Sequence, residues 1–456
     1  MEWTPAIADR PGPLYERIVE ALASDIDGGR LTRGQQLPTH RTLAKALDVD
    51  LSTVTRAYRE ARERGLVEAR VGQGTFVAES LAQVRHARAP WAAFDLSMNL
   101  PPQPLDADLE GRIARGVAAI SREEGLSSYL AYRETGGPAE ERDAVAAWLR
   151  RRLPEAAADR LVICPGTQCA LLLVLASAVG RGETVLTEAL TYPGVKAAAE
   201  FTGVNLVGLA TDGEGVLPDA LLAACKAHRP KALYLVPTIN NPTTVTISAA
   251  RRAAVVEIAR AHDLLLIEDD AYGLLEPDAV PLATLAPERT FYLASLSKCM
   301  APGLRTSFLL APDAAAAHAV ADGLRAVAQM ATPLMSALAV RWIRDGSADA
   351  IVGAIREESA ARQKLAAQVL EGLPYAARPT GHHLWLSLPR GWTQSELTAH
   401  VQRQGLAVVP SDAFSVGGNA PNAIRVALGA ASSRHELATA LGVLVTALRS
   451  PPSRVI

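Results

Sequence analysis

The chain has 456 residues, of which 49% are hydrophobic and 21% charged, and its formal net charge is −2. This composition excludes a collagenous, disordered or disulfide-stapled protein and supplies apolar side chains for a sizeable core. Apolar stretches such as residues 170–179 are shorter than the roughly 20 residues that span a bilayer, and charges interrupt the N-terminus before a signal-peptide core can form. We therefore expect a cytoplasmic protein with reduced thiols. Its four cysteines form no paired CxxC, so we expect no metal site.

The N-terminal residues predict a helix-turn-helix. An apolar face at helical spacing spans residues 13–27 and ends at a Gly-Gly pair. After it, Thr39 can cap a short helix over residues 40–46, and a four-residue turn follows. Ser52 can then cap a second helix that runs to about residue 64. Two helices separated by such a turn are typical of this motif.

Residues 65–77 predict two short strands that form a wing. The first 78 residues are neutral overall, but residues 30–64 carry eight basic and four acidic side chains. This local positive excess favours DNA phosphates as the partner, although an Arg-rich helix can also be only a solvated face. We expect DNA contacts from the N-terminal parts of the two helices and from the wing, at Thr39, Arg41, Ser52, Thr53, Thr55, Arg56, Arg59, Gly72, Gln73 and Gly74.

This segment resembles the winged helix-turn-helix domain of GntR-type bacterial transcriptional regulators. The resemblance covers residues 12–78 and rests on the motifs PLYERIVEAL, LPTHRTLA, STVTRAY and GQGTFV. It implies a DNA-binding domain over residues 1–78. Thr39 and His40 stand where the family more often has two small hydroxyl residues, so the base preference at that position does not carry over.

A segment without periodicity, residues 79–93, predicts a linker to a second domain over residues 94–456. In that domain, short apolar runs alternate with helical segments, which is typical of an α/β fold with a mainly parallel sheet and helices on both faces. The chemistry of such sheets gathers at the carboxyl ends of the strands. The expected strands are residues 161–164, 184–187, 205–210, 232–237, 264–269, 291–297 and 306–311.

Lys298 is the candidate reactive residue of the second domain. It is one of only six lysines, and it follows an apolar run next to small side chains. We expect partial desolvation, which favours the neutral amine that can form a Schiff base; an ordinary surface lysine is the alternative. Groups suited to a phosphate dianion are found nearby or at the start of a predicted helix. They are Ser295, Ser297 and Arg305, together with Gly166, Thr167 and Gln168.

Four further residues at strand ends suit a pyridine cofactor. Asp269 can keep a pyridinium nitrogen protonated, and Tyr272 and Asn241 can hydrogen-bond a phenolate oxygen. Tyr192 can stack on the ring. Three of them have a structural alternative, namely a helix cap for Asp269, a turn for Asn241 and a core position for Tyr192. Asp270 is a second candidate for the ring nitrogen, and the D-x-x-Y spacing favours Asp269.

Over about residues 95–445 the chain resembles class I/II aminotransferases of the fold-type I family, which depend on pyridoxal 5′-phosphate (PLP). The motifs are PGTQ, TYPG, NNPT, D-x-x-Y, S-x-S-K and AIRVALG, with Thr244 where glycine usually follows NPT. The resemblance implies that Lys298 carries PLP as an internal aldimine and that Arg425 binds a substrate α-carboxylate. The other cofactor residues would be those named above, joined by Tyr132 from the partner subunit.

Together the two parts resemble the MocR subfamily of GntR-type regulators. The resemblance implies a winged helix fused to a fold-type I domain, whose smaller C-terminal lobe starts at about residue 330, in a head-to-tail homodimer. It also implies a PLP-dependent regulator that binds operator DNA and senses an amino acid or amine. Arg425 favours an effector with a carboxylate.

Two other functions remain open at this point. One is a catalytic aminotransferase with an accessory DNA-binding domain, and the other is a regulator without PLP, against which the intact Lys298, Asp269 and Arg305 speak. Either His382 or His383 can face the effector, although hydrogen-bonded core positions are favoured for both.

Overall fold

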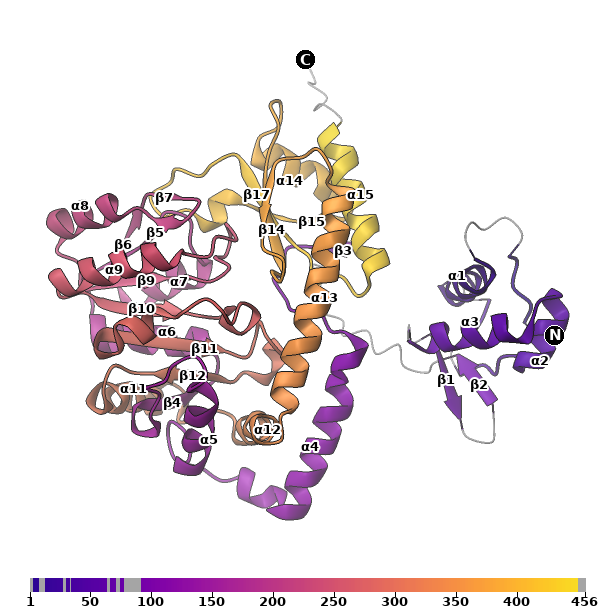
Figure 1. Cartoon of the computed structure of the whole chain (residues 1–456), viewed down its shortest axis with the longest axis horizontal. Coiled ribbons are helices and arrows are strands. Elements are labelled where there is room, and N and C mark those ends of the chain that lie inside the picture. The colour runs from indigo at the N-terminus through magenta and orange to yellow at the C-terminus, as the bar shows by residue number, and fades with distance from the viewer. Residues whose placement is uncertain are drawn as a thin grey trace. The chain divides into compact units, whose positions relative to one another are not determined.

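The computed structural model describes residues 3–7, 13–27, 30–32, 34–63, 66–70, 74–77 and 92–449. The chain folds as two compact units, which divide between residues 86 and 87 (Figure 1). Most of the predicted linker lies outside the described residues, as do Gly28, Gly29, Gly72 and Gln73.

The N-terminal unit contains the expected helix-turn-helix and wing. Its elements are α1 (Leu14–Asp27), α2 (His40–Leu47), α3 (Leu51–Glu63), β1 (Val67–Arg70) and β2 (Gly74–Val77). The two strands pair antiparallel, with Val67 opposite Val77. A small core that includes Leu22, Leu43 and Val54 joins the three helices, so the apolar faces of these helices pack against one another.

The two helices of the motif begin differently. As predicted, the Thr39 side chain caps α2 by accepting from the backbone N of Thr42 at 3.2 Å. The prediction that Ser52 caps α3 is wrong. Asp50 Oδ1 accepts from both the backbone N and the hydroxyl of Ser52, each at 3.0 Å, so Asp50 satisfies the free amide in the first turn of the helix.

The second unit is built on a seven-stranded sheet with the order β4-β12-β11-β10-β9-β5-β6. Only β12 runs antiparallel to its neighbours in this sheet, so the sheet is mainly parallel, as predicted. Each expected apolar run forms one of its strands. They are β4 (Leu161–Cys164), β5 (Thr184–Glu188), β6 (Asn205–Leu209), β9 (Ala232–Leu235), β10 (Leu265–Asp269), β11 (Thr290–Ser295) and β12 (Ser307–Leu310).

Helices cover both faces of this sheet. In β9, Ala232 and Tyr234 face one apolar core while Leu233 and Leu235 face another, as the alternation of a strand requires. The helices of the second unit are α4 (Leu109–Glu123), α5 (Ala139–Leu149), α6 (Thr167–Val174), α7 (Pro193–Thr202), α8 (Pro218–His228), α9 (Ala249–Ala261), α10 (Leu282–Leu285), α11 (Ala314–Ala328), α12 (Pro333–Arg344), α13 (Ser347–Val369), α14 (Gln394–Arg403) and α15 (Arg434–Arg449).

A smaller C-terminal lobe has its own sheet and core. The sheet has the order β13-β14-β17-β16, and a separate short pair joins β3 to β15. The strands are β3 (Phe94–Asp95), β13 (Tyr375–Ala377), β14 (His383–Ser387), β15 (Leu406–Ala407), β16 (Val409–Pro410) and β17 (Ala423–Ala427). Outside the lobe, a hairpin pairs β7 (Thr211–Asp212) with β8 (Gly215–Val216).

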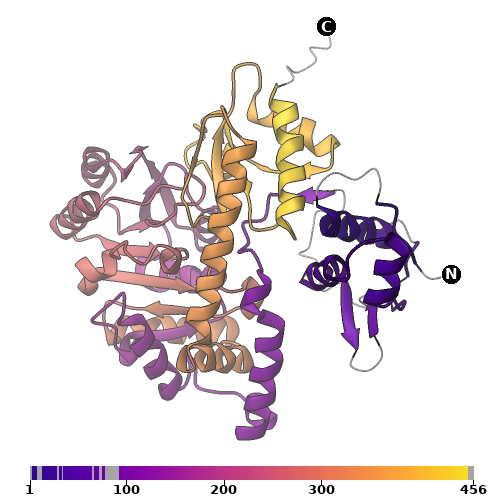
Figure 2. The same cartoon turned by 45° about the vertical axis from the view of Figure 1, so that its right-hand side comes forward.

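The long helix α13 runs from the large core to the C-terminal lobe (Figures 1 and 2). Its residues Ile351 and Ile355 pack in the large core with α12, whereas Ala366 packs in the core of the lobe together with Leu96. Apart from Leu96, the buried residues of that core run from Ala366 to Leu448. No helix in the described part of the chain is long and apolar enough to cross a membrane.

Candidate cofactor and effector site

Most of the predicted cofactor residues meet at one edge of the large sheet. The strands β4, β5, β9, β10 and β11 point in the same direction, so their carboxyl ends share this edge. Because β12 is antiparallel, its first residues lie there too, with Ser307 opposite both Ser295 and Cys164. The arrangement brings together segments that are more than 100 residues apart in the sequence.

Lys298 lies three residues beyond the end of β11 and is partly buried. Its Nζ donates to the backbone oxygen of Asn99 at 2.5 Å. The pKa of this amine is lowered to about 8. Burial is the main cause, the positive charge of Arg425 adds to it, and the carboxylate of Asp269 opposes the change. A larger fraction of Lys298 is therefore a neutral nucleophile at pH 7 than of an ordinary lysine.

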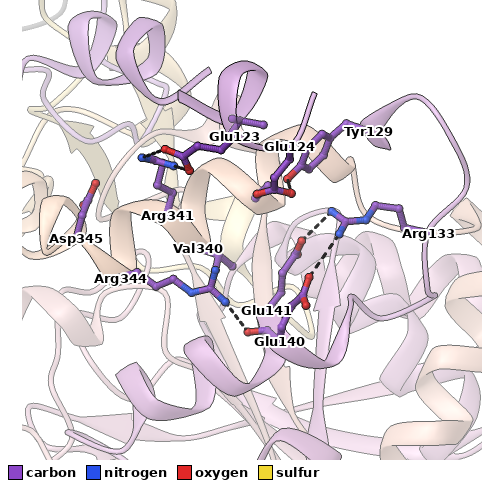
Figure 3. Close-up of a pocket in the computed structure, with 12 residues that line it drawn as sticks. Glu123, Glu124, Tyr129, Arg133, Glu140, Glu141, Val340, Arg341, Arg344 and Asp345 are labelled. Atoms are coloured by element: carbon purple, nitrogen blue, oxygen red, sulfur yellow. Dashed lines mark hydrogen bonds and ion pairs between the residues drawn. The ribbon is translucent and has the colours of Figure 1, made fainter. Parts of the chain in front are cut away.

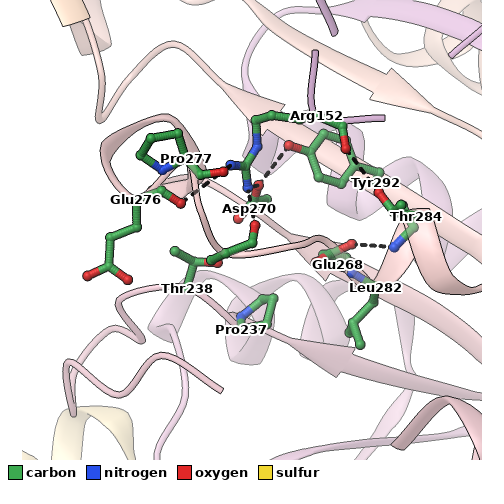
Figure 4. A network of polar contacts seen from close by, with 12 residues as sticks. Arg152, Pro237, Thr238, Glu268, Asp270, Glu276, Pro277, Leu282, Thr284 and Tyr292 are labelled. Atoms are coloured by element: carbon green, nitrogen blue, oxygen red, sulfur yellow. Dashed lines mark hydrogen bonds and ion pairs between the residues drawn. The ribbon is translucent and has the colours of Figure 1, made fainter. Parts of the chain in front are cut away.

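The two neighbouring aspartates at the end of β10 have different partners. Asp270 accepts from Arg152 Nη2 at 2.9 Å and from the Tyr292 hydroxyl at 2.7 Å, in the buried network of Figure 4. Asp269 accepts from the Tyr234 hydroxyl at 2.8 Å, and among the described residues no arginine forms an ion pair with it. Burial raises the pKa of Asp269 to about 6, while the Tyr234 hydrogen bond opposes the rise. Asp269 is thus the carboxylate whose charge is not already matched by a guanidinium.

Arg425 lies in β17 of the C-terminal lobe, and its side chain is buried beside the site. Nη1 donates to Asn241 Oδ1 at 3.0 Å, and Nη2 donates to the backbone oxygen of Ser97. Burial lowers the pKa of this guanidinium to about 10, so it remains charged at neutral pH. Tyr272 is also buried, and its hydroxyl accepts from Asn99 Nδ2 at 2.8 Å.

The predicted anion cradle lies at the start of α6. Gly166 has φ +94°, and a Cβ built there would lie 2.5 Å from Arg305 Nη2, so glycine lets the guanidinium approach the helix end. Arg305 also donates to the backbone oxygen of Pro165 at 3.1 Å. The Thr167 hydroxyl is buried without a hydrogen-bond partner in the described part of the chain.

Of the remaining predicted cofactor residues, all but Tyr132 are buried or partly buried. The backbone N of Ser297 donates to the Ser295 hydroxyl at 3.1 Å, while Gln168 Nε2 donates to the backbone oxygen of Gly194 at 2.8 Å. Tyr192 precedes α7 and is partly buried, and burial raises its pKa. Tyr132 differs from all of them because its side chain is 82% exposed.

The predicted DNA-contacting residues lie mainly on the exposed surface of the N-terminal unit. Arg41, Thr55 and Arg59 are exposed, as are Ser52 and Gly74, while Thr53 is partly buried. Arg56 is exposed, and its guanidinium stacks 3.8 Å from the ring centroid of Tyr15 on α1. Gly72 and Gln73 lie outside the described residues.

Two family descriptions match the sequence, "Bacterial regulatory proteins, gntR family" over residues 14–77 and "Aminotransferase class I and II" over residues 95–444. A relative from Bacillus subtilis, the uncharacterized HTH-type transcriptional regulator YdeF, is 30% identical over 453 residues, which cover 97% of this chain and 96% of the relative. The chain belongs to the GntR-type regulators with an aminotransferase domain. This is the architecture of the MocR subfamily, as the sequence predicted.

The second unit of this GntR-type regulator is also similar to enzymes. The 2-aminoadipate transaminase of Thermus thermophilus is 30% identical over 325 residues, which cover 69% of this chain and 80% of the enzyme. The crystal structure of LysN, an α-aminoadipate aminotransferase from the same organism complexed with N-(5′-phosphopyridoxyl)-L-leucine, matches with a TM-score of 0.71 and 26% identity. That match covers 79% of this chain and 92% of LysN, and the fold is therefore that of fold-type I aminotransferases.

The sequence did not indicate several residues that contact the predicted site of the regulator. Asn99 and Ser97 come from a coil segment without a pattern, and Tyr234 is one apolar strand position among several. His382 and His383 are both buried and hydrogen-bonded, the first to the backbone oxygen of Lys298 at 2.6 Å. Tyr234 contacts Asp269 because β9 lies beside β10, and this strand order is not visible in the sequence.

The regulator also has a cavity of about 310 Å³ away from these residues, between α4, α5 and α12 (Figure 3). Two of its arginines pair with carboxylates of the lining. Arg133 donates to Glu141 at 2.9 Å, and Arg341 donates to Glu123 at 2.8 Å. The lining carries five acidic side chains against three arginines, so the cavity does not suit a phosphate or a carboxylate ligand.

Proposed function

We propose that this chain is a PLP-dependent transcriptional regulator that senses an amino acid or a related amine. The observation that carries the proposal is the convergence of Lys298, Asp269 and Arg425 at one sheet edge in a chain that also has a GntR winged helix. The proposed DNA-binding domain spans residues 1–78, the linker residues 79–93, and the effector-binding domain residues 94–456.

Buried polar atoms in the site fit PLP. A buried polar atom without a partner costs free energy, so several such atoms in one place are explained by a polar ligand. Within the described residues they are Asn99 Oδ1, Thr167 Oγ1, Gln168 Oε1, Asp269 Oδ1 and Arg425 Nε. Three of them match groups of PLP and of an amino acid: the Thr167 hydroxyl can donate to a phosphate, Asp269 Oδ1 can accept from a protonated pyridine nitrogen, and Arg425 Nε can donate to a carboxylate.

Each group of the ligand would have its own partners. Asp269 would hold the ring nitrogen, Tyr272 and Asn241 the phenolate oxygen, and Tyr192 the face of the ring. The phosphate would go to Gly166, Thr167, Gln168, Ser295, Ser297 and Arg305. When bound, PLP supplies an aldehyde that condenses reversibly with amines, and the lowered pKa of Lys298 favours the neutral amine for this purpose.

Arg425 would bind the carboxylate of the effector. Its guanidinium is buried and charged, and its Nε has no hydrogen-bond partner in the described part of the chain. A carboxylate would form a charge-assisted contact there, so we expect an amino acid rather than a simple amine. An effector changes DNA binding only if it binds two states of the regulator with different affinity.

We further propose a head-to-tail homodimer, in which Tyr132 serves the phosphate of the neighbouring subunit. The exposed side chain of Tyr132, beside Leu130 with 88% exposure, supports this role. Two chains would also present two winged helices to the two halves of an operator.

Reduction with borohydride tests the cofactor proposal. The purified protein should be yellow, and reduction followed by peptide mapping should place the pyridoxyl group on Lys298. The Lys298→Ala variant should lose the covalent link while it keeps its fold. A pyridoxyl group on any of the five other lysines, or none at all in protein incubated with PLP, would contradict the proposal.

A catalytic aminotransferase is the second candidate function, favoured by the 30% identity to a transaminase. Turnover of an amino donor with a 2-oxo acid over many cycles per site would support it. A regulator should instead show a spectral change with each effector molecule and a matching change in DNA binding.

A further inference from the structure

Asn99 lies at the centre of the hydrogen bonds around the proposed site. Its side chain is 6% exposed. Nδ2 lies 2.8 Å from the Tyr272 hydroxyl and 3.0 Å from His383 Nδ1. Its backbone oxygen separately accepts from Lys298. Asn99 therefore contacts both the lysine and one of the two residues proposed for the phenolate oxygen.

The direction of these hydrogen bonds follows from His383. Its Nε2 lies 3.0 Å from the backbone oxygen of Asn240, which can only accept, so Nε2 carries the hydrogen. Burial lowers the pKa of His383 to about 3, so the ring is neutral and Nδ1 is an acceptor. Asn99 must then present its NH₂ group, and the second hydrogen of that group goes to the Tyr272 oxygen. The Tyr272 hydroxyl thus accepts from Asn99 and keeps its own hydrogen for another acceptor.

We propose that Asn99 is a positioning residue that fixes Tyr272 as a hydrogen-bond donor toward the phenolate oxygen of PLP. This inference rests on the proposed function. A hydroxyl whose oxygen accepts a hydrogen bond is a stronger donor, because bonds in a chain polarise one another. Stronger donation stabilises the negative phenolate and so favours the unprotonated form of the link between PLP and Lys298.

The other charged and titratable groups near this chain of contacts stay in place when Asn99 is changed. Those that act on Tyr272 or His383 are Arg425, Asp269, Tyr192, Lys298 and His382. The contact of the Asn99 backbone oxygen with Lys298 does not depend on the Asn99 side chain. Substitution therefore isolates the bond to Tyr272 and the bond to His383.

The experiment is a pH titration of the visible absorption of the PLP-loaded full chain. In Asn99→Ala, the midpoint of the titration should rise by about 0.5 pH unit, since the phenolate loses the strengthened donor. Asn99→Asp keeps the size of the side chain, but its carboxylate accepts the Tyr272 hydrogen. Its midpoint should rise further than that of Asn99→Ala. An unchanged midpoint in Asn99→Ala would overturn the proposal, because the new negative charge of Asn99→Asp raises the midpoint by itself.

A second measurement separates positioning from a general structural effect. If Asn99 acts through Tyr272, Asn99→Ala should shift the midpoint in the wild-type background and not in the Tyr272→Phe background. An equal shift in both backgrounds would overturn the proposal. If wild type shows no visible band with PLP, the proposed function fails and this inference falls with it. A wild-type band with no effect of Asn99 refutes the inference alone.

Discussion

Removing the charge of Arg425 should make Lys298 a weaker nucleophile at neutral pH. Burial is the main cause of the low pKa of Lys298, and the positive charge of Arg425 is the second. Arg425→Gln removes that charge while it keeps an NH₂ group that can donate to Asn241. The pKa of Lys298 should therefore rise above 8 and stay below its ordinary value of 10.5, because the burial remains.

The size of the effect follows from the fraction of neutral amine. With a pKa of about 8, about one Lys298 side chain in ten is neutral at pH 7, against about three in ten thousand for an ordinary lysine. A rise of about one in this pKa lowers the neutral fraction about tenfold. Covalent binding of PLP at pH 7 should slow by the same factor, since only the neutral amine attacks the aldehyde.

The assay is the rate of covalent PLP binding to protein stripped of cofactor, followed by visible absorption between pH 6 and 10. Wild type should show a midpoint near pH 8, and Arg425→Gln a higher midpoint. Arg425→Lys keeps the charge and is the matched control, with a midpoint near that of wild type. Equal midpoints for the Gln and Lys variants, or a wild-type midpoint above pH 10, would refute the reasoning.

Substitutions at three other places test single residues of the chain. Arg152→Met leaves Asp270 buried without its cation and should lower the free energy of unfolding by about 3–5 kcal/mol in urea denaturation; a loss below about 1 kcal/mol would contradict it. Arg41→Ala should weaken DNA binding by about 1–3 kcal/mol at fixed salt, measured by fluorescence anisotropy, and undiminished affinity would remove Arg41 from the interface. Asp50→Ala should destabilise the N-terminal unit by about 1 kcal/mol and Ser52→Ala by less in thermal unfolding, and the reverse order would restore Ser52 as the cap.

The large sheet could be predicted from the sequence because its strands are buried on both faces. Such strands appear as short continuous apolar runs, and polar residues follow them at the edge where chemistry takes place. Asp269 and Lys298 could be chosen for this reason, because Asp269 ends β10 and Lys298 lies three residues after β11. The Arg152 ion pair of Asp270 supports the choice of aspartate, but the two residues are 118 positions apart, too far for a local pattern to indicate the pair.

Contacts between distant coil segments could not be predicted. Asn99 and Tyr272 are separated by 173 positions, and Asn99 lies in a stretch without helix or strand periodicity. The cap of α3 was missed for a local reason. Asp50 and Ser52 are both good N-cap residues, and only the position at which the helix begins decides between them.

The central claim is that binding of an effector at the PLP site changes DNA binding. The most direct measurement titrates amino acids into the PLP-loaded protein and records the visible spectrum, the occupancy of DNA selected by the protein, and transamination on the same preparation. For a regulator, we expect spectrum and DNA occupancy to change with the same half-saturation, and Lys298→Ala to lose both responses. DNA occupancy that ignores every amino acid that changes the spectrum, together with rapid transamination, would contradict the claim.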